Sequence, residues 1–314
     1  MTVETALATA HATGIGDDYE EFRQALLERG LLHDTGTPGV YGYSLAYQGI
    51  VDAIDRSITR LGAGRYEPVR FPPVLVRSTF DRTGYLHSFP DLMGSVHVFK
   101  GGDREHRELS RRYDEGGTWP ELLEPAEVVL SSAACHSLYP LCTGTLPADG
   151  RSLEINNWCF RHEPSADPAR MVAFRMHELV YVGYPDVAQD HRDTVLADGI
   201  RLLGDLGLPM STVPANDPFF GRVGSMLASA QLEENLKLEG TTPICSEERP
   251  TAIISGNCAR DHFGDPFEIA TPDGEVAHSS CVAFGVDRIT LALLHRHGLV
   301  PDEWPTDVRR CLFA

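Results

Sequence analysis

The feature that most constrains this chain is the segment 158–183, WCFRHEPSADPARMVAFRMHELVYVG, in which two strand-like halves flank a polar loop. Successive side chains of a strand point to opposite faces, so Arg161 and Glu163 share one face of the first half. Phe174 and Glu178 share one face of the returning half. Arginine binds phosphate, a carboxylate can accept from an adenine amino group, and an aromatic ring can stack on the base. The pattern predicts a nucleotide site, although a surface hairpin held by cross-strand ion pairs also fits it.

A second pattern lies near the C-terminus. Residues 281–284 (CVAF) indicate a short strand, Gly285 allows a sharp turn, and an apolar helix follows over 289–294. Arg288 falls in the first turn of this helix, where its charge opposes the helix dipole. A bound phosphate would account for an arginine at this place. The alternative is a contact of Arg288 with Asp287 or another nearby carboxylate.

The rest of the chain alternates strand-like runs and turns with a few longer helices. Helices are expected over 18–32, 44–61, 185–206, 224–238 and 285–297. Strands are expected at 69–71, 96–99, 128–130, 158–161, 171–178, 252–254 and 281–284. The strands cluster in hairpins, which predicts an α+β fold with an antiparallel sheet flanked by helices. We expect a helical lead-in over residues 1–43 and one large domain over 44–314.

Composition limits the partners and the compartment. The chain has 27 Lys and Arg residues against 45 Asp and Glu residues, and the resulting net charge of −18 repels nucleic acid unless a local basic patch overcomes it. No apolar run approaches the roughly 18–20 residues that a membrane span needs, and residues 1–18 do not resemble a secretory signal. The seven cysteines form no CxxC pair, and this odd number favours a reducing cytoplasm over a disulfide framework.

The two patterns together resemble motifs two and three of class II aminoacyl-tRNA synthetases. These are the F-R-x-E strand at 160–163 and the G-x-x-R turn at 285–288, which leads into an apolar helix. The helix at 44–61, followed by the Phe-Pro-Pro sequence at 71–73, is similar to motif one, which builds the dimer interface in that family. Each motif alone is weakly specific, but the three occur in order. The resemblance implies the synthetase sheet and a homodimer.

The chain resembles in particular the amino acid:carrier protein ligases, truncated homologues of the zinc-dependent seryl-tRNA synthetases of methanogens. The resemblance covers nearly the whole chain and implies a catalytic domain over 44–314 without a tRNA-binding domain. It also implies one zinc ion (Zn²⁺) per subunit, held by Cys135, Glu178 and Cys281. Two thiolates and a carboxylate leave a fourth zinc position free, and in the relatives the substrate amino group takes it. The alternative is that both cysteines only pack in an apolar interior, the usual fate of a free cysteine.

The resemblance further implies ATP with Mg²⁺ and two catalytic arginines. Arg161 would hold the α-phosphate, and Arg288 would hold the γ-phosphate of a bent ATP. The other expected ATP ligands are Glu163 and Phe174 at the adenine, Arg170 near the outer phosphates, and Met171. The expected contacts to the amino acid are Glu178, Lys237, Ser255 and Asn257.

The implied reaction activates a small amino acid, glycine or alanine, as an aminoacyl-adenylate and transfers it to the 4′-phosphopantetheine thiol of an acyl or peptidyl carrier protein. Serine stays open because of the synthetase ancestry. Two segments are candidate carrier surfaces, the arginine-rich 104–112 and the mixed apolar and basic 214–237; the resemblance favours the second. No tRNA or membrane partner is expected. The rival interpretations are a serine-type aminoacyl-tRNA synthetase or tRNA-modifying enzyme, and a non-catalytic synthetase-like binding module.

Overall fold

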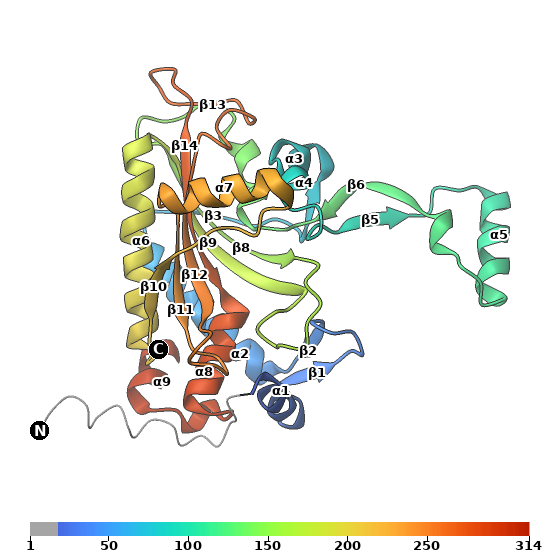
Figure 1. Cartoon of the computed structure of the whole chain (residues 1–314), viewed down its shortest axis with the longest axis horizontal. Helices are drawn as coiled ribbons and strands as arrows, with labels where there is room; N and C mark the ends of the chain where they lie inside the picture. The colour runs from blue at the N-terminus through green and yellow to red at the C-terminus, as the bar shows by residue number, and fades with distance from the viewer. Residues whose placement is uncertain (1–17, 314) are drawn as a thin grey trace, which may run out of the picture.

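Seven strands form the main sheet, in the order β10-β11-β12-β14-β9-β8-β3 (Figure 1). Their bounds are β3 Glu67–Val69, β8 Arg151–Phe160, β9 Ala173–Gly183, β10 Ser211–Pro214, β11 Lys237–Thr242, β12 Thr251–Arg260 and β14 His278–Gly285. Neighbouring strands are antiparallel except for the parallel pair β3 and β8. The computed structural model describes residues 18–313, apart from the side chains of residues 222–224, 227 and 230. The predicted α+β fold with an antiparallel sheet is confirmed.

Helices pack their apolar sides on one face of this sheet and build the main core. The bounds are α2 Leu45–Gly62, α6 Pro185–Asp205, α8 Val286–His297 and α9 Thr306–Phe313. Helix α2 begins where the Ser44 side chain accepts a hydrogen bond from the Tyr47 N–H, as an N-cap does. Ile50, Ile54 and Ile58 follow at four-residue spacing, so they share one face and are buried. None of the helices in the described residues is long and apolar enough to span a bilayer.

The described part of the predicted lead-in joins the same core. Helix α1 (Tyr19–Glu28) is capped by Asp18 and buries Phe22 and Leu26 against residues of α2 and α8. The short hairpin of β1 (Leu32–Asp34) and β2 (Tyr41–Tyr43) connects α1 to α2. Residues 1–17 of the lead-in lie outside the described residues, and the division at residue 43 stays a prediction.

The predicted hairpin at 158–183 exists and is longer than expected. Strands β8 and β9 pair antiparallel, with Trp158 opposite Arg175 and Phe160 opposite Ala173. Residues 151–157 (RSLEINN) also belong to β8, although their polar side chains gave no strand pattern. Side chains alternate along β9 between the helix-covered face, where Leu179 lies, and the opposite face, where Glu178 lies. This alternation decides which β9 side chains reach the site.

The boundaries of α7 and β3 are among those that differ from the predictions. Helix α7 runs over Gly221–Glu233, and the predicted helix to residue 238 is wrong because Lys237 already begins β11. Asn235 adopts a left-handed backbone conformation, with φ at 53°, which cannot continue a helix. The strand predicted at 69–71 lies at Glu67–Val69 instead, two residues earlier.

A smaller sheet carries an arm that reaches away from the body (Figure 1). Its strands β4 (Val74–Val76), β6 (Glu124–Leu130) and β5 (Ser95–Val98) lie in the order β4-β6-β5, and α5 (Asp103–Asp114) stands at the far end of the β5–β6 hairpin. Arg111 and Arg112 both pair with Glu108, so the basic surface expected at 104–112 is partly neutralised. The remaining short elements are α3 Arg77–Arg82, α4 Tyr85–Ser88, β7 Gly144–Thr145 and β13 Ile269–Ala270.

Candidate active site

A cavity of about 480 Å³ lies over strands β9, β12 and β14. Its walls also come from α4, the turn at Cys135–Ser137, the β8–β9 loop, the segment before α7 and the start of α8. All of the site residues predicted from the sequence line this cavity: Cys135, Arg161, Glu163, Arg170, Met171, Phe174, Glu178, Lys237, Ser255, Asn257, Cys281 and Arg288. The fold therefore brings them together, and their individual roles stay predictions.

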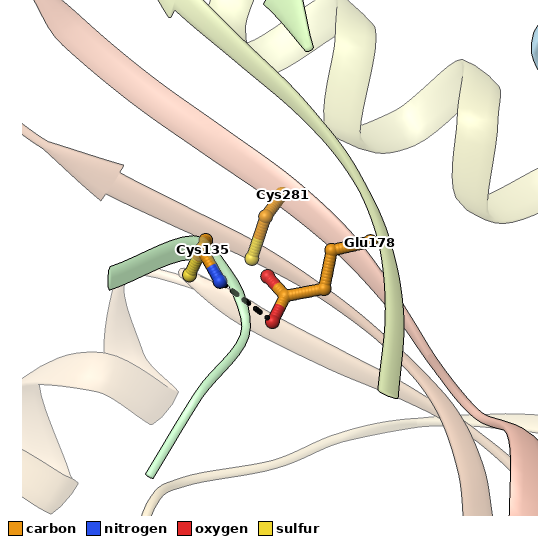
Figure 2. A group of neighbouring side chains, drawn as sticks. All are labelled: Cys135, Glu178 and Cys281. Carbon is orange, nitrogen blue, oxygen red and sulfur yellow. Dashed lines mark hydrogen bonds between the residues drawn. The ribbon is translucent and has the colours of Figure 1, made fainter. Parts of the chain in front are cut away.

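Cys135, Glu178 and Cys281 form a tight cluster at one end of the cavity. Cys135 lies on the short 3-10 turn after β6, Glu178 on β9 and Cys281 on β14. One ligand atom from each residue lies within 4.8 Å of the others. Figure 2 shows the two sulfur atoms and the carboxylate pointing toward one another. Two soft sulfur donors and one carboxylate oxygen are a ligand set that suits Zn²⁺.

The surroundings of Glu178 fit a metal. Its Oε1 accepts hydrogen bonds from the backbone N–H of Ala134, at 2.9 Å, and of Cys135, at 3.2 Å. Its Oε2 is buried and has no hydrogen-bond partner among the described residues, which leaves it available to a cation. The hydrogen bond to Cys281, burial and the Glu178 charge raise the pKa of the Cys135 thiol. A divalent cation would lower this pKa by stabilising the thiolate. The buried negative charges of the cluster therefore destabilise the fold without a cation and are compensated when a cation is bound.

Asn257 and Ser255 lie beside this cluster on β12. Asn257 is opposite Cys281 in the β12–β14 register, and its Nδ2 lies 3.6 Å from the Cys281 sulfur. The same amide lies 3.3 Å from the Ser255 hydroxyl oxygen. Both side chains therefore face the place where a ligand of the cluster would sit, as the predicted substrate contacts require.

Arginines gather at the other end of the cavity. The Arg161 Nε–H donates to the Ser132 carbonyl at 3.2 Å. Arg288 donates from Nε to the Ala169 carbonyl at 2.8 Å and from Nη1 to the Ala252 carbonyl at 3.0 Å. A guanidinium has five N–H donors, so both arginines keep donors for a ligand. Burial and the nearby charges of Arg161 and Arg170 lower the pKa of Arg288. Like charges brought together in a strongly acidic chain indicate a site for an anion.

The remaining predicted ATP ligands surround these arginines. The Arg161 guanidinium lies over the Phe174 ring, with the guanidinium carbon 5.5 Å from the ring centroid. Glu163 and Arg170 are 3.4 Å apart, and both are partly exposed. The Met171 sulfur accepts from the Tyr43 hydroxyl at 3.3 Å. An aromatic face next to arginines and a carboxylate forms a surface that a nucleotide could occupy.

Lys237 has two carboxylate partners in this structure. Its ammonium lies 2.6 Å from Asp217 Oδ1 and 3.0 Å from Glu239 Oε1. Burial opposes the charge, but these two carboxylates outweigh it and raise the pKa of Lys237. Asp217 also binds Gln231 of α7, so it ties the segment before α7 to β11. Sequence analysis missed Asp217, because a single acidic residue in a loop has no pattern that marks it.

The comparisons with known proteins agree with this geometry. No protein-family model matches the chain. Two curated relatives from Bradyrhizobium diazoefficiens, amino acid--[acyl-carrier-protein] ligases 2 and 1, are 44% and 42% identical to it over 284 residues. The match covers 90% of this chain and 85% and 87% of those proteins. The chain belongs to this ligase family. The resemblance seen in the motifs is confirmed.

Synthetases are more distant relatives of this family member. A type-2 serine–tRNA ligase of Methanopyrus kandleri is 29% identical over 280 residues, which are 81% of this chain and 52% of that protein. A solved M. kandleri seryl-tRNA synthetase, in complex with an A. aeolicus tRNA, has a TM-score of 0.78 over 92% of this chain and 59% of its own. A Pyrococcus horikoshii seryl-tRNA synthetase complexed with ATP has a TM-score of 0.68 at 15% identity. These likenesses establish the class II synthetase fold.

Proposed function

We propose that this ligase activates a small amino acid, glycine or alanine, with ATP and transfers it to the 4′-phosphopantetheine thiol of a carrier protein. The names of the B. diazoefficiens relatives support this reaction class. The observation that carries the proposal is that the cysteine–glutamate–cysteine cluster and the arginines open onto one cavity. One end suits a zinc-held amino group, and the other suits phosphates. An aminoacyl-adenylate needs both ends in one site.

In the first step, the amino acid carboxylate attacks the α-phosphorus of ATP. A new O–P bond forms, and the bond to the β-phosphate oxygen breaks, so pyrophosphate leaves. The carboxylate is already ionised at neutral pH, so the protein supplies no nucleophile and acts by positioning and charge stabilisation. Arg161 would stabilise the charge on the α-phosphate, and Arg288 would hold the γ-phosphate. Arg170 and Mg²⁺ would balance the remaining phosphate charge, while Phe174 and Glu163 would hold the adenine.

The amino acid would be oriented by the cluster at the other end of the cavity. Cys135, Glu178 and Cys281 would hold a zinc ion, and this Lewis acid would keep the substrate amine neutral and unable to act as a nucleophile. Ser255 and Asn257 would contact the bound amino acid from β12. Lys237 is already neutralised by Asp217 and Glu239, so we place it at the wall of the pocket, where it holds the segment before α7.

In the second step, the carrier thiol attacks the carbonyl carbon of the adenylate. A C–S bond forms, the C–O bond to AMP breaks, and the thiol proton passes to solvent or to the leaving phosphate. The chain and an acidic carrier would repel each other, so docking needs local apolar or basic contacts. Of the two predicted surfaces, the second presents exposed Phe220, directly before α7, and exposed Met226 on α7, whereas Arg111 and Arg112 of α5 pair with Glu108. Arg222, a basic residue of the same segment, lies outside the described side chains.

The proposed enzyme is a cytoplasmic homodimer. Motif-one resemblance is the basis for the dimer, and α2 with the edge strand β3 would form its interface. The test of the function is transfer of radiolabelled glycine, alanine or serine, each with ATP, to a holo carrier, an apo carrier or tRNA. Label on the holo carrier alone supports the proposal. Label on tRNA would favour a serine-type synthetase, and no label with any acceptor would favour a binding module.

A further inference from the structure

Arg175 and Asp287 form a buried ion pair in the wall of the cavity. Arg175 follows Phe174 on β9, and Asp287 precedes Arg288 at the start of α8. Adjacent side chains of a strand point to opposite faces, so the Arg175 guanidinium reaches Gln48 of α2 on the helix-covered face, although both Phe174 and Arg175 contribute to the cavity lining. The pair thus joins the two elements that carry a predicted adenine contact and a predicted phosphate contact.

The Asp287 carboxylate is fully used by its partners. Its Oδ2 accepts from the Arg175 backbone N–H at 2.6 Å and from Arg175 Nε at 3.2 Å. Its Oδ1 accepts from Arg175 Nη2 and, at 3.2 Å, from the Tyr47 hydroxyl. The side chains of Arg175 and Asp287 are only 6% and 3% exposed. A bidentate pair of this kind fixes the direction as well as the distance between two elements.

Residues of α2, β2 and β8 complete the arrangement around Arg175. Gln48 Oε1 accepts from Arg175 Nη1, and the rings of Tyr43 and Trp158 lie 4.7 Å and 4.9 Å from the guanidinium carbon. The guanidinium is therefore held on its edge by hydrogen bonds and on its faces by aromatic rings. The guanidinium therefore has little freedom to rotate, and its contacts fix the position of β9 relative to the start of α8.

We propose that Arg175 is a positioning residue for ATP: its ion pair with Asp287 fixes the start of α8 against β9 and thereby sets the spacing between Arg288 and Phe174. The identity of the ligand as ATP rests on the proposed function. A buried ion pair is seldom the most stable way to fill a core, because desolvation offsets its attraction. In this protein, the ion pair instead fixes the positions of Phe174 and Arg288, the chain neighbours of its two members, in the lining of the cavity.

Arg175→Lys and Tyr47→Phe test this role on the zinc-loaded full chain. Lysine keeps the charge but loses the two-pronged contact, and phenylalanine removes a single hydroxyl from Asp287. The matched control is Arg23→Lys, which weakens contacts with Asp34 and the Tyr41 hydroxyl that lie outside the cavity lining. The readouts are the Kd for ATP by calorimetry, the KM values for ATP and for the amino acid, the zinc content and the Tm.

The proposal predicts a selective effect on ATP. Arg175→Lys should raise the Kd and KM for ATP roughly three- to tenfold, and Tyr47→Phe about two- to threefold, with zinc content and the amino acid KM unchanged. Arg23→Lys should lower the Tm without changing either ATP value. ATP affinity that stays at the wild-type value in both variants, with activity falling only as the folded fraction falls, would overturn the proposal. A wild type that binds ATP but forms no adenylate would refute the proposed function and leave the Kd comparison valid.

Discussion

Replacing Glu178 by glutamine tests the proposed metal centre most sharply. Two backbone N–H groups, of Ala134 and Cys135, donate to Glu178 Oε1, so the glutamine carbonyl oxygen will take that place. The amide NH₂ must then occupy the place of the unpartnered Oε2, facing Cys135 and Cys281. An amide NH₂ has no lone pair for a cation, so one of the three ligands is lost while the shape is kept.

We expect zinc affinity to fall at least about 100-fold, because mutation of residues that only hydrogen-bond to a metal ligand already lowers metal affinity about 10- to 100-fold. At free zinc 100 times the wild-type Kd, zinc stabilises the wild type by about 2.7 kcal/mol, and the variant by about 0.4 kcal/mol. Without zinc, the variant should be at least as stable as the wild type, because it removes a carboxylate buried beside two sulfur atoms.

Chemical unfolding with and without zinc, together with zinc content by mass spectrometry, measures both effects. Glu163→Gln is the matched control, since it changes a carboxylate of the same cavity away from the cluster and should bind zinc normally. A Glu178→Gln protein that keeps the wild-type zinc content and the full zinc-dependent stabilisation would refute the metal assignment.

Two further predictions concern the phosphate site and pH. Arg288→Ala should lower amino-acid-dependent ATP–pyrophosphate exchange at least about 100-fold at unchanged zinc content, because removing one preorganised donor costs that much. The control Arg201→Ala changes an exposed arginine and should leave exchange unchanged. Undiminished exchange in Arg288→Ala would contradict the phosphate role. Burial and the charge of Arg65 lower the pKa of His191 to about 4, so the folded state keeps it neutral between the Tyr66 and Ser280 hydroxyls. Below pH about 6.5 the unfolded chain binds a proton on this residue that the folded chain excludes, so the contribution of His191 alone should cost about 2 kcal/mol of stability when the pH is lowered from 7 to 5. Urea unfolding of His191→Gln should show a shallower pH dependence than the wild type, and an equal dependence would contradict this account.

The sequence predicts the parts of the site that local pattern defines. Strand alternation predicts that Arg161 and Glu163 share one face of a strand, but β8 ends at Phe160, and both residues reach the cavity from the β8–β9 loop. Arg288 follows from an arginine placed where a helix dipole disfavours it. The cluster of Cys135, Glu178 and Cys281 came from family resemblance, because residues 43 and 103 positions apart share no local period. The structure adds that these ligand atoms converge to within 4.8 Å.

The contacts that sequence analysis missed join distant segments. Arg175 meets Asp287 across 112 positions and Gln48 across 127, and no spacing rule connects them. The predicted helix includes Lys237 because the helical apolar spacing of α7 continues beyond residue 233. In the structure, Asn235 adopts a left-handed conformation that ends the helix, and β11 begins at Lys237. Tertiary pairing of β11 with β12 decides this segment over its local helical preference.

Amino-acid-dependent ATP–pyrophosphate exchange, run with each of the twenty amino acids on zinc-loaded and chelated protein, tests the central claim most directly. We predict exchange with glycine or alanine, lost when zinc is removed and restored when zinc is returned. The cavity would then hold the adenylation chemistry that its cluster and its arginines are proposed to share. Absence of exchange with every amino acid on fully zinc-loaded protein would contradict the account.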